Sequence, residues 1–190
     1  MAETMLSRRL WMRTLYVALS LAVILLHLLP LGIARPSPLE PGPWLARVWA
    51  APDLVVALTF AWAVRRPEYV PILAVAGVGL TADLLLQRPP GLGAALLVLG
   101  TETLRARAPG LRDQTFLSEW GAVASTLLLM ILGERLMLTV VMADRAPLAL
   151  VLARILTTLA AYPAVVLASA ALMGVRRRAP AEPDPTGRTA

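Results

Sequence analysis

The feature that most limits the fold is the recurrence of long apolar runs along nearly the whole 190-residue chain. A helix needs about 20 apolar residues to cross the hydrocarbon core of a bilayer, and several runs approach that length. Hydrophobic residues make up 58% of the chain and charged residues only 16%, with a mean hydropathy of +0.70. A soluble domain of this size needs more polar surface. The sequence therefore predicts an all-α integral membrane protein.

We predict six membrane spans packed as one compact helical bundle. The expected boundaries are about 11–33, 45–66, 69–86, 91–107, 116–142 and 148–175. The first run is longer than the core of a secretory signal, so we expect it to remain as an uncleaved span. Span two opens at Pro52 and Asp53, because proline suits the first helical turn and a carboxylate favours the positive end of the helix dipole.

Spans two and four are short for a full crossing. We expect the stretch at 44–51, which contains two Trp residues, to lie in the headgroup region and to complete span two. The proline-rich tail at 179–190 has few apolar residues, so it is expected to be disordered in the cytoplasm.

Arginine placement predicts the orientation of the bundle. All 18 basic residues are Arg, and they gather at the ends of apolar runs. That distribution is typical of membrane orientation and of contact with anionic lipid, and it argues against nucleic-acid binding. With the N-terminus in the cytoplasm, twelve arginines lie inside and four outside; the four are Arg35, Arg47, Arg88 and Arg145. We therefore expect both termini in the cytoplasm.

No recognisable pattern groups residues for catalysis or for metal binding. The chain has no Cys, which excludes disulfides, thiolate nucleophiles and Cys-ligated metals. HExxH, a GxSxG elbow and a glycine-rich phosphate loop are also missing from the sequence. A catalytic Glu102 would need a second group, and we find none. We expect neither an enzyme nor a cofactor.

Four ionisable residues lie inside predicted spans at one depth, in the outer half of the bilayer: His27, Asp83, Glu134 and Arg154. A central charge costs about 2.5–3.5 kcal/mol even on the lower scales, so each needs a partner or a wet surface. In one interpretation Glu134 or Asp83 pairs with Arg154 as glue between helices, while Arg135 extends outward. In a second, these residues form a polar face for a partner helix or a substrate; a proton relay is a third.

Other residues inside the spans indicate how the helices pack. The lone His27 is typical of a hydrogen-bonded interior histidine rather than of a ligand or catalyst. Small residues flank Asp83 and permit close approach of another helix, within this chain or in a dimer: Gly77, Gly79, Gly91, Gly93 and Gly100. Pro163 removes a helix hydrogen bond and predicts a kink in span six. On the cytoplasmic side we expect Glu102 and Glu119 to lie near Arg105 and Arg107.

The order of these features resembles the rod shape-determining protein MreD family, particularly its alphaproteobacterial-type members. The resemblance covers about residues 8–178 and rests on APDLVVALTFAWAVRRPEYVP, GVGLTADLLLQRPPGLGAAL and LTTLAAYPAVVLASAALMGVRRR. Its most specific part is Gly79-x-x-x-Asp83 followed by Gly91, and Pro52, Trp62 and Pro163 match weaker family positions. Pro90 stands where the family usually has an apolar residue.

The resemblance implies a non-enzymatic component of the bacterial rod or elongation complex, located in the inner membrane. Such a protein acts as a scaffold that binds MreC. It helps to couple the MreB cytoskeleton, indirectly, to lateral peptidoglycan synthesis by RodA and its penicillin-binding transpeptidase partner, and so to maintain cell shape.

Family members are also similar in fold to the S component of energy-coupling-factor transporters, a bundle of six helices. That similarity implies an alternative function as a small-molecule-binding membrane transport subunit. Such a subunit needs an outward-facing pocket with several polar and aromatic residues. Only 5% of the residues are aromatic and the sequence indicates no crowded polar pocket. We therefore expect a scaffold without a small-molecule substrate.

Overall fold

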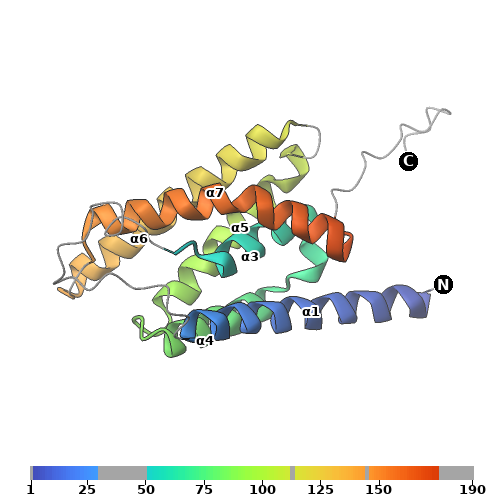
Figure 1. Ribbon diagram of the computed structural model, residues 1–190, viewed down its shortest axis with the longest axis horizontal. Helices are drawn as coiled ribbons and strands as arrows, with labels where there is room; N and C mark the ends of the chain where they lie inside the picture. The colour runs from blue at the N-terminus through green and yellow to red at the C-terminus, as the bar shows by residue number, and fades with distance from the viewer. Residues whose placement is uncertain (1, 30–50, 112–113, 144–145, 176–190) are drawn as a thin grey trace.

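The computed structural model of the chain describes residues 2–29, 51–111, 114–143 and 146–175 (Figure 1). Within these ranges the secondary structure is entirely helical, which confirms the predicted class. The α-helices are α1 (Ala2–Leu28), α3 (Leu54–Arg65), α4 (Ile72–Leu85), α5 (Leu92–Leu111), α6 (Phe116–Val140) and α7 (Leu148–Met173), and a 3-10 helix, η1, covers Pro67–Tyr69. The predicted tail and residues 44–50 of the predicted interfacial stretch lie outside the described residues.

Within the described ranges, three helices are long and apolar enough to cross a membrane: Ser7–Leu28 within α1, all of α6 and all of α7. Helices α3 and α4 have 12 and 14 residues. At 1.5 Å per residue they are about 18 and 21 Å long, which is less than the hydrocarbon thickness of about 30 Å. The three long apolar helices indicate a membrane protein, and six complete spans stay a prediction.

The helix ends differ from the predicted ones around α4 and α5. Helix α5 has 20 residues and extends beyond residue 107, the predicted end of the fourth span. It continues to Leu111 because Ala108 and Leu111 are buried against the bundle, and Pro109 falls in the last turn, where few helical hydrogen bonds follow it. Helix α4 begins at Ile72 instead of residue 69, because prolines interrupt the helix and leave η1 between α3 and α4.

Helix α3 forms the centre of the bundle, with nine of its twelve residues buried. Its composition explains the position, because almost every residue is apolar and no face is polar. It packs against α5, α7 and α1. Figure 1 shows α3 and α5 between the α1–α4 pair on one side and the α6–α7 pair on the other. Within each pair the two helices are in contact.

An aromatic cluster fixes α3 against its neighbours. Trp62 is fully buried, and its ring centroid lies 5.9 Å from that of Tyr16 and 6.4 Å from that of Tyr69. Such spacings are typical of favourable aromatic pairs. The Trp62 indole N–H donates to the Ser169 hydroxyl of α7 at 3.1 Å, which satisfies its buried polar atom. Helix α7 itself continues through Pro163.

Candidate functional site

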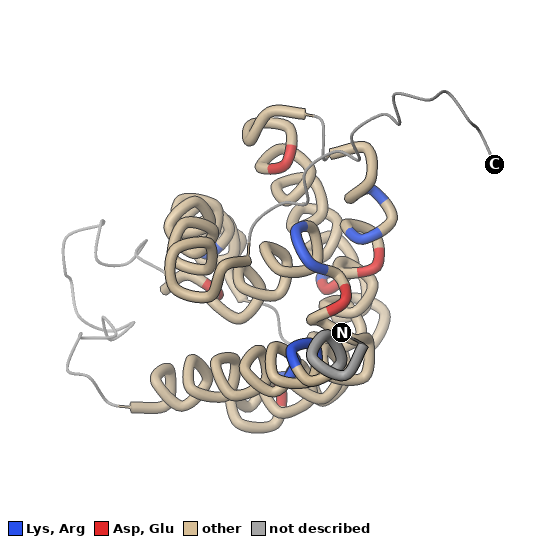
Figure 2. The backbone as a smooth tube through the Cα atoms, turned by 90° about the vertical axis from the view of Figure 1, so that its right-hand side faces the viewer, with Lys and Arg blue, Asp and Glu red and all other residues tan. Residues whose placement is uncertain are grey.

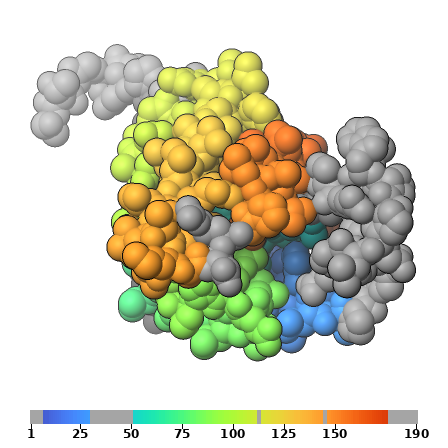
Figure 3. Space-filling view, turned by 90° about the vertical axis from the view of Figure 1, so that its left-hand side faces the viewer, coloured from blue at the N-terminus to red at the C-terminus, as the bar shows by residue number. Residues whose placement is uncertain are grey.

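A cavity of about 290 Å³ opens at the end of the bundle where α1, α4 and α6 end and where α3, α5 and α7 begin. Figure 3 looks onto this end, where the α4–α5 turn and the start of α7 surround the opening. All six α-helices contribute to the wall. Most of the wall is apolar, and seven side chains that line it are polar or charged: His27, Asp53, Asp83, Arg88, Glu134, Arg154 and Thr158.

The structure thus brings the four intramembrane candidates together at one cavity. His27, Asp83, Glu134 and Arg154 come from four different helices and from positions up to 127 residues apart in the numbering. The sequence indicated no crowded polar pocket, and the cavity is mostly apolar with these few polar groups in its wall. Asp53 and Arg88, which looked on sequence grounds like a helix start and an outer turn, complete the polar group only because the fold brings their segments together.

Asp83 is 1% exposed and is a cap for the neighbouring helix. Its Oδ2 accepts the backbone N–H groups of Gly91 at 3.1 Å and Ala94 at 3.0 Å, at the start of α5. These N–H groups have no partner inside a helix, and the positive end of the helix dipole favours a carboxylate. The proposed pairing of Asp83 with Arg154 is therefore not formed, because the backbone of α5 already satisfies this carboxylate.

The glycines around Asp83 make this capping possible. Gly91 has a φ of +88°, which a residue with a side chain rarely adopts. A Cβ on Gly93 would lie 2.3 Å from the Asp83 Oδ1, and a Cβ on Gly79 would lie 2.7 Å from the Ala94 Cα. The packing interpretation of Gly79 is thus observed within this chain, between α4 and α5. Gly93, another of the glycines that flank Asp83 in the sequence, takes part in the same close contact.

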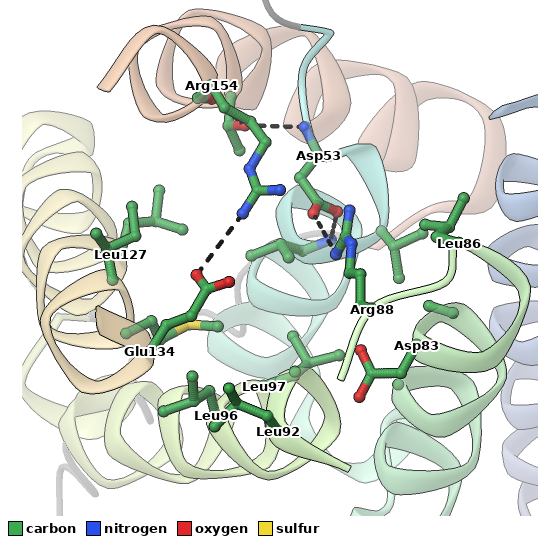
Figure 4. Close-up of a pocket in the computed structure, with 18 of the residues that line it drawn as sticks. Asp53, Asp83, Leu86, Arg88, Leu92, Leu96, Leu97, Leu127, Glu134 and Arg154 are labelled. Atoms are coloured by element: carbon green, nitrogen blue, oxygen red, sulfur yellow. Dashed lines mark hydrogen bonds and ion pairs between the residues drawn. The ribbon is translucent and has the colours of Figure 1, made fainter. Parts of the chain in front are cut away.

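Asp53 and Arg88 join three segments at the cavity rim. Asp53 Oδ1 accepts the Val56 N–H at 3.3 Å and caps α3, as its position beside Pro52 predicted. The Arg88 guanidinium lies 3.4 Å from Asp53 Oδ2, and the Asp53 N–H donates to the Thr158 hydroxyl of α7 at 2.9 Å. Figure 4 shows Asp53 and Arg88 facing each other across the cavity mouth.

Glu134 and Arg154 form the second ion pair of the cavity, with 3.9 Å between the nearest nitrogen and oxygen. The pair links α6 and α7, as one of the interpretations from sequence had it. The side chains stay 35% and 34% exposed, and Figure 4 shows them pointing toward each other across the cavity. The neighbouring Arg135 turns away and donates to the Ala146 carbonyl at 2.8 Å.

His27 lies in the cavity wall with its Nδ1 3.0 Å from the Val23 carbonyl oxygen. A carbonyl oxygen only accepts, so Nδ1 is the donor of this hydrogen bond within α1. The arrangement is that of an interior hydrogen-bonded histidine. No group of three or more potential metal ligands occurs among the residues that the structure describes.

A separate buried cluster lies at the opposite end of the bundle. Glu119 is completely buried; Arg65 Nη2 lies 3.2 Å from both of its oxygens, and the Tyr162 hydroxyl donates to Oε1 at 2.7 Å. The sequence predicted Glu102 and Glu119 near Arg105 and Arg107; Glu102 pairs with Arg105, and the Glu119 carboxylate contacts Arg65 of α3 and Tyr162 of α7. Figure 2 looks onto this end, where acidic and basic positions lie close together.

Arg105 instead serves its own side of the bundle. It pairs with Glu102 one turn earlier on α5 and donates to the Val70 carbonyl, so it ties α5 to the chain that follows η1.

No protein-family model, curated protein or solved structure matches this chain.

Proposed function

We propose that the protein is a non-enzymatic scaffold of the MreD type in the bacterial inner membrane. In this role it binds MreC and helps to couple MreB to the peptidoglycan synthases RodA and its transpeptidase partner, with both termini in the cytoplasm. The observation that carries the proposal is that Gly79, Asp83 and Gly91, the residues of the resembling motif, act together in one α4–α5 unit. A helical hairpin in which each of these three residues has a fixed role explains their spacing better than apolar composition alone.

The outer surface of α6 is compatible with a partner helix. Leu129, Leu132, Leu136 and Val140 are 56–68% exposed and follow one another at helical spacing along one face. In a membrane such a face meets lipid or another span. A protein with a single span, such as MreC, suits this surface.

The direct test is recovery of MreC on the tagged protein from detergent-solubilised membranes of cells that produce both. We expect MreC to be enriched over its level on an unrelated six-span membrane protein produced from the same vector. Equal recovery on both proteins would contradict the scaffold proposal.

A second candidate is favoured by the cavity: a small-molecule-binding membrane transport subunit with an S-component-like fold. Ligand pockets are concave, mostly apolar and equipped with a few convergent polar groups, which describes this cavity. Native mass spectrometry of the purified protein tests this role. A ligand that copurifies at a fixed stoichiometry supports it, and spectra of the bare chain alone count against it.

A further inference from the structure

The charged groups of the cavity differ in how much of their hydrogen-bonding capacity is used within the protein. Asp83 accepts two backbone N–H groups, and Asp53 accepts one and also pairs with Arg88. The Glu134 carboxylate and the Arg154 guanidinium approach only to 3.9 Å, and neither makes a hydrogen bond within the described residues. A guanidinium has five N–H donors and a carboxylate about four acceptor sites, so this pair retains its binding capacity.

The charge balance of the cavity limits what can bind there. Arg88 offsets Asp53, Arg154 offsets Glu134, and the start of α5 offsets the Asp83 carboxylate. A ligand with one sign of charge would leave either Glu134 or Arg154 facing a like charge, or without its partner. Because an uncompensated charge in a poorly solvated site is costly, a ligand with both signs is favoured.

The rest of the wall defines the body of the ligand. Leu92, Leu96, Leu127, Met130 and Ile155 surround the polar pair with apolar surface. The volume of about 290 Å³ lies at the lower end of the roughly 300–1,000 Å³ typical of small-molecule pockets. The cavity therefore fits a small apolar body, or the head and first carbons of a larger amphipathic molecule.

We propose that this cavity binds a zwitterion with an apolar body, whose ammonium group contacts Glu134 and whose carboxylate or phosphate contacts Arg154. A bidentate guanidinium contact would replace the loose internal pair with charge-assisted hydrogen bonds. Free apolar amino acids and zwitterionic phospholipids share this chemistry. The inference rests on the second proposed function, since it names the ligand class of that site, and it is independent of MreC binding.

The first experiment uses the unaltered full-length protein in detergent and isothermal titration calorimetry. The probes are leucine, methionine and phenylalanine, each with both charges. The matched controls for leucine are 4-methylpentanoate, which lacks the ammonium group, and 3-methylbutylamine, which lacks the carboxylate. We expect at least one amino acid to bind roughly tenfold or more tightly than its single-charge analogues, since a site loses affinity when its polar group is left unpaired.

A second arm identifies a lipid source. The protein is extracted from nanodiscs that contain equal amounts of phosphatidylethanolamine and phosphatidylglycerol, and retained lipids are counted by native mass spectrometry. Preferential retention of phosphatidylethanolamine identifies the phospholipid source, and amino-acid binding identifies the free one.

Variants connect either signal to the pair. We expect Glu134→Gln and Arg154→Gln each to reduce binding or retention about tenfold, and Arg135→Gln, which does not line the cavity, to leave it unchanged. The proposal would be overturned if a single-charge analogue bound as tightly as its amino acid, or if Glu134→Gln and Arg154→Gln both bound as tightly as the unaltered protein. In either case the cavity would still be a ligand site, for another class of ligand. Binding of no probe and no lipid would overturn the ligand class, and a bare chain after purification would remove the second proposed function too.

Discussion

At the scale of single residues, the two most buried carboxylates have different partners. Asp83 is held by backbone N–H groups, and Glu119 by a guanidinium and a phenol. Asp83 lines the same cavity as Glu134 and Arg154, whose side chains are about one-third exposed, and Glu119 lies at the other end of the bundle. This division separates carboxylates that stabilise the fold from a pair that is available for binding.

We expect Asp83→Asn to insert in the membrane but to lower the stability of the fold by about 1–2 kcal/mol, because hydrogen bonds to a charged acceptor become neutral ones. If the scaffold proposal is right, the variant also weakens assembly with MreC or alters cell shape. Thermal unfolding in detergent measures the first effect. Glu134→Gln at the same end is the control and should change stability by less than about 1 kcal/mol, because its ion pair is partly exposed. Equal melting temperatures for Asp83→Asn and the unaltered protein would contradict the capping role.

The buried Arg65–Glu119 pair at the other end of the bundle should contribute more to the stability of the fold than the Asp83 cap. Arg65→Met leaves the Glu119 charge with only part of its compensation, and breaking a buried pair costs about 3–5 kcal/mol. We expect the double variant Arg65→Met/Glu119→Gln to recover much of that loss, since no unpaired charge remains. A double variant that is as unstable as the two single losses added together would show that the charges do not interact.

At the scale of elements, the α4–α5 hairpin is the part that the sequence signalled best. Its two helices approach closely at Gly79 and Gly93, and the Asp83 side chain of α4 accepts hydrogen bonds from the backbone at the start of α5. Because Gly93 lies against the Asp83 carboxylate, we expect the close contact between α4 and α5 and the capping of α5 by Asp83 to depend on each other. A change in either one should displace the other.

Gly93→Ala tests this dependence. Its added Cβ would lie 2.3 Å from the Asp83 Oδ1, so we expect the cap to be displaced and the melting temperature to fall. Gly77→Ala is the matched control, because no atom lies within 4 Å of the added Cβ and alanine favours a helix by up to about 1 kcal/mol. The two variants should therefore shift stability in opposite directions. A shift of the same sign and size in both would show that the hairpin contact is unimportant.

At the scale of the whole molecule, the described bundle has two different ends, one with the cavity and one with the buried Arg65–Glu119 cluster. The α4–α5 turn and the ends of α1 and α6 lie with the cavity, and the Arg65–Glu119 cluster lies at the other end. The arginine distribution then predicts which end faces the cytoplasm.

Reporter fusions test that orientation. Alkaline phosphatase fused after residue 190 should be inactive, because it stays in the cytoplasm, and the same enzyme fused after residue 143 should be active outside. The two fusions are controls for each other's expression, which an antibody to the reporter measures. An active fusion at the C-terminus would reverse the predicted orientation.

The sequence by itself determined the helical class, a helix start near Pro52 and Asp53, and the importance of Gly79, Asp83 and Gly91; that Asp53 is the N-cap of a helix beginning at Leu54 came from the structure. These depend on apolar run length, local hydrogen bonding and glycine conformation, which short stretches encode. Only the tertiary structure decided that Asp83 caps α5, that Arg88 meets Asp53 across 35 positions, and that Glu119 pairs with Arg65. The physical reason is that a carboxylate in a bundle has several possible partners at similar depth, and only helix rotation and packing select one.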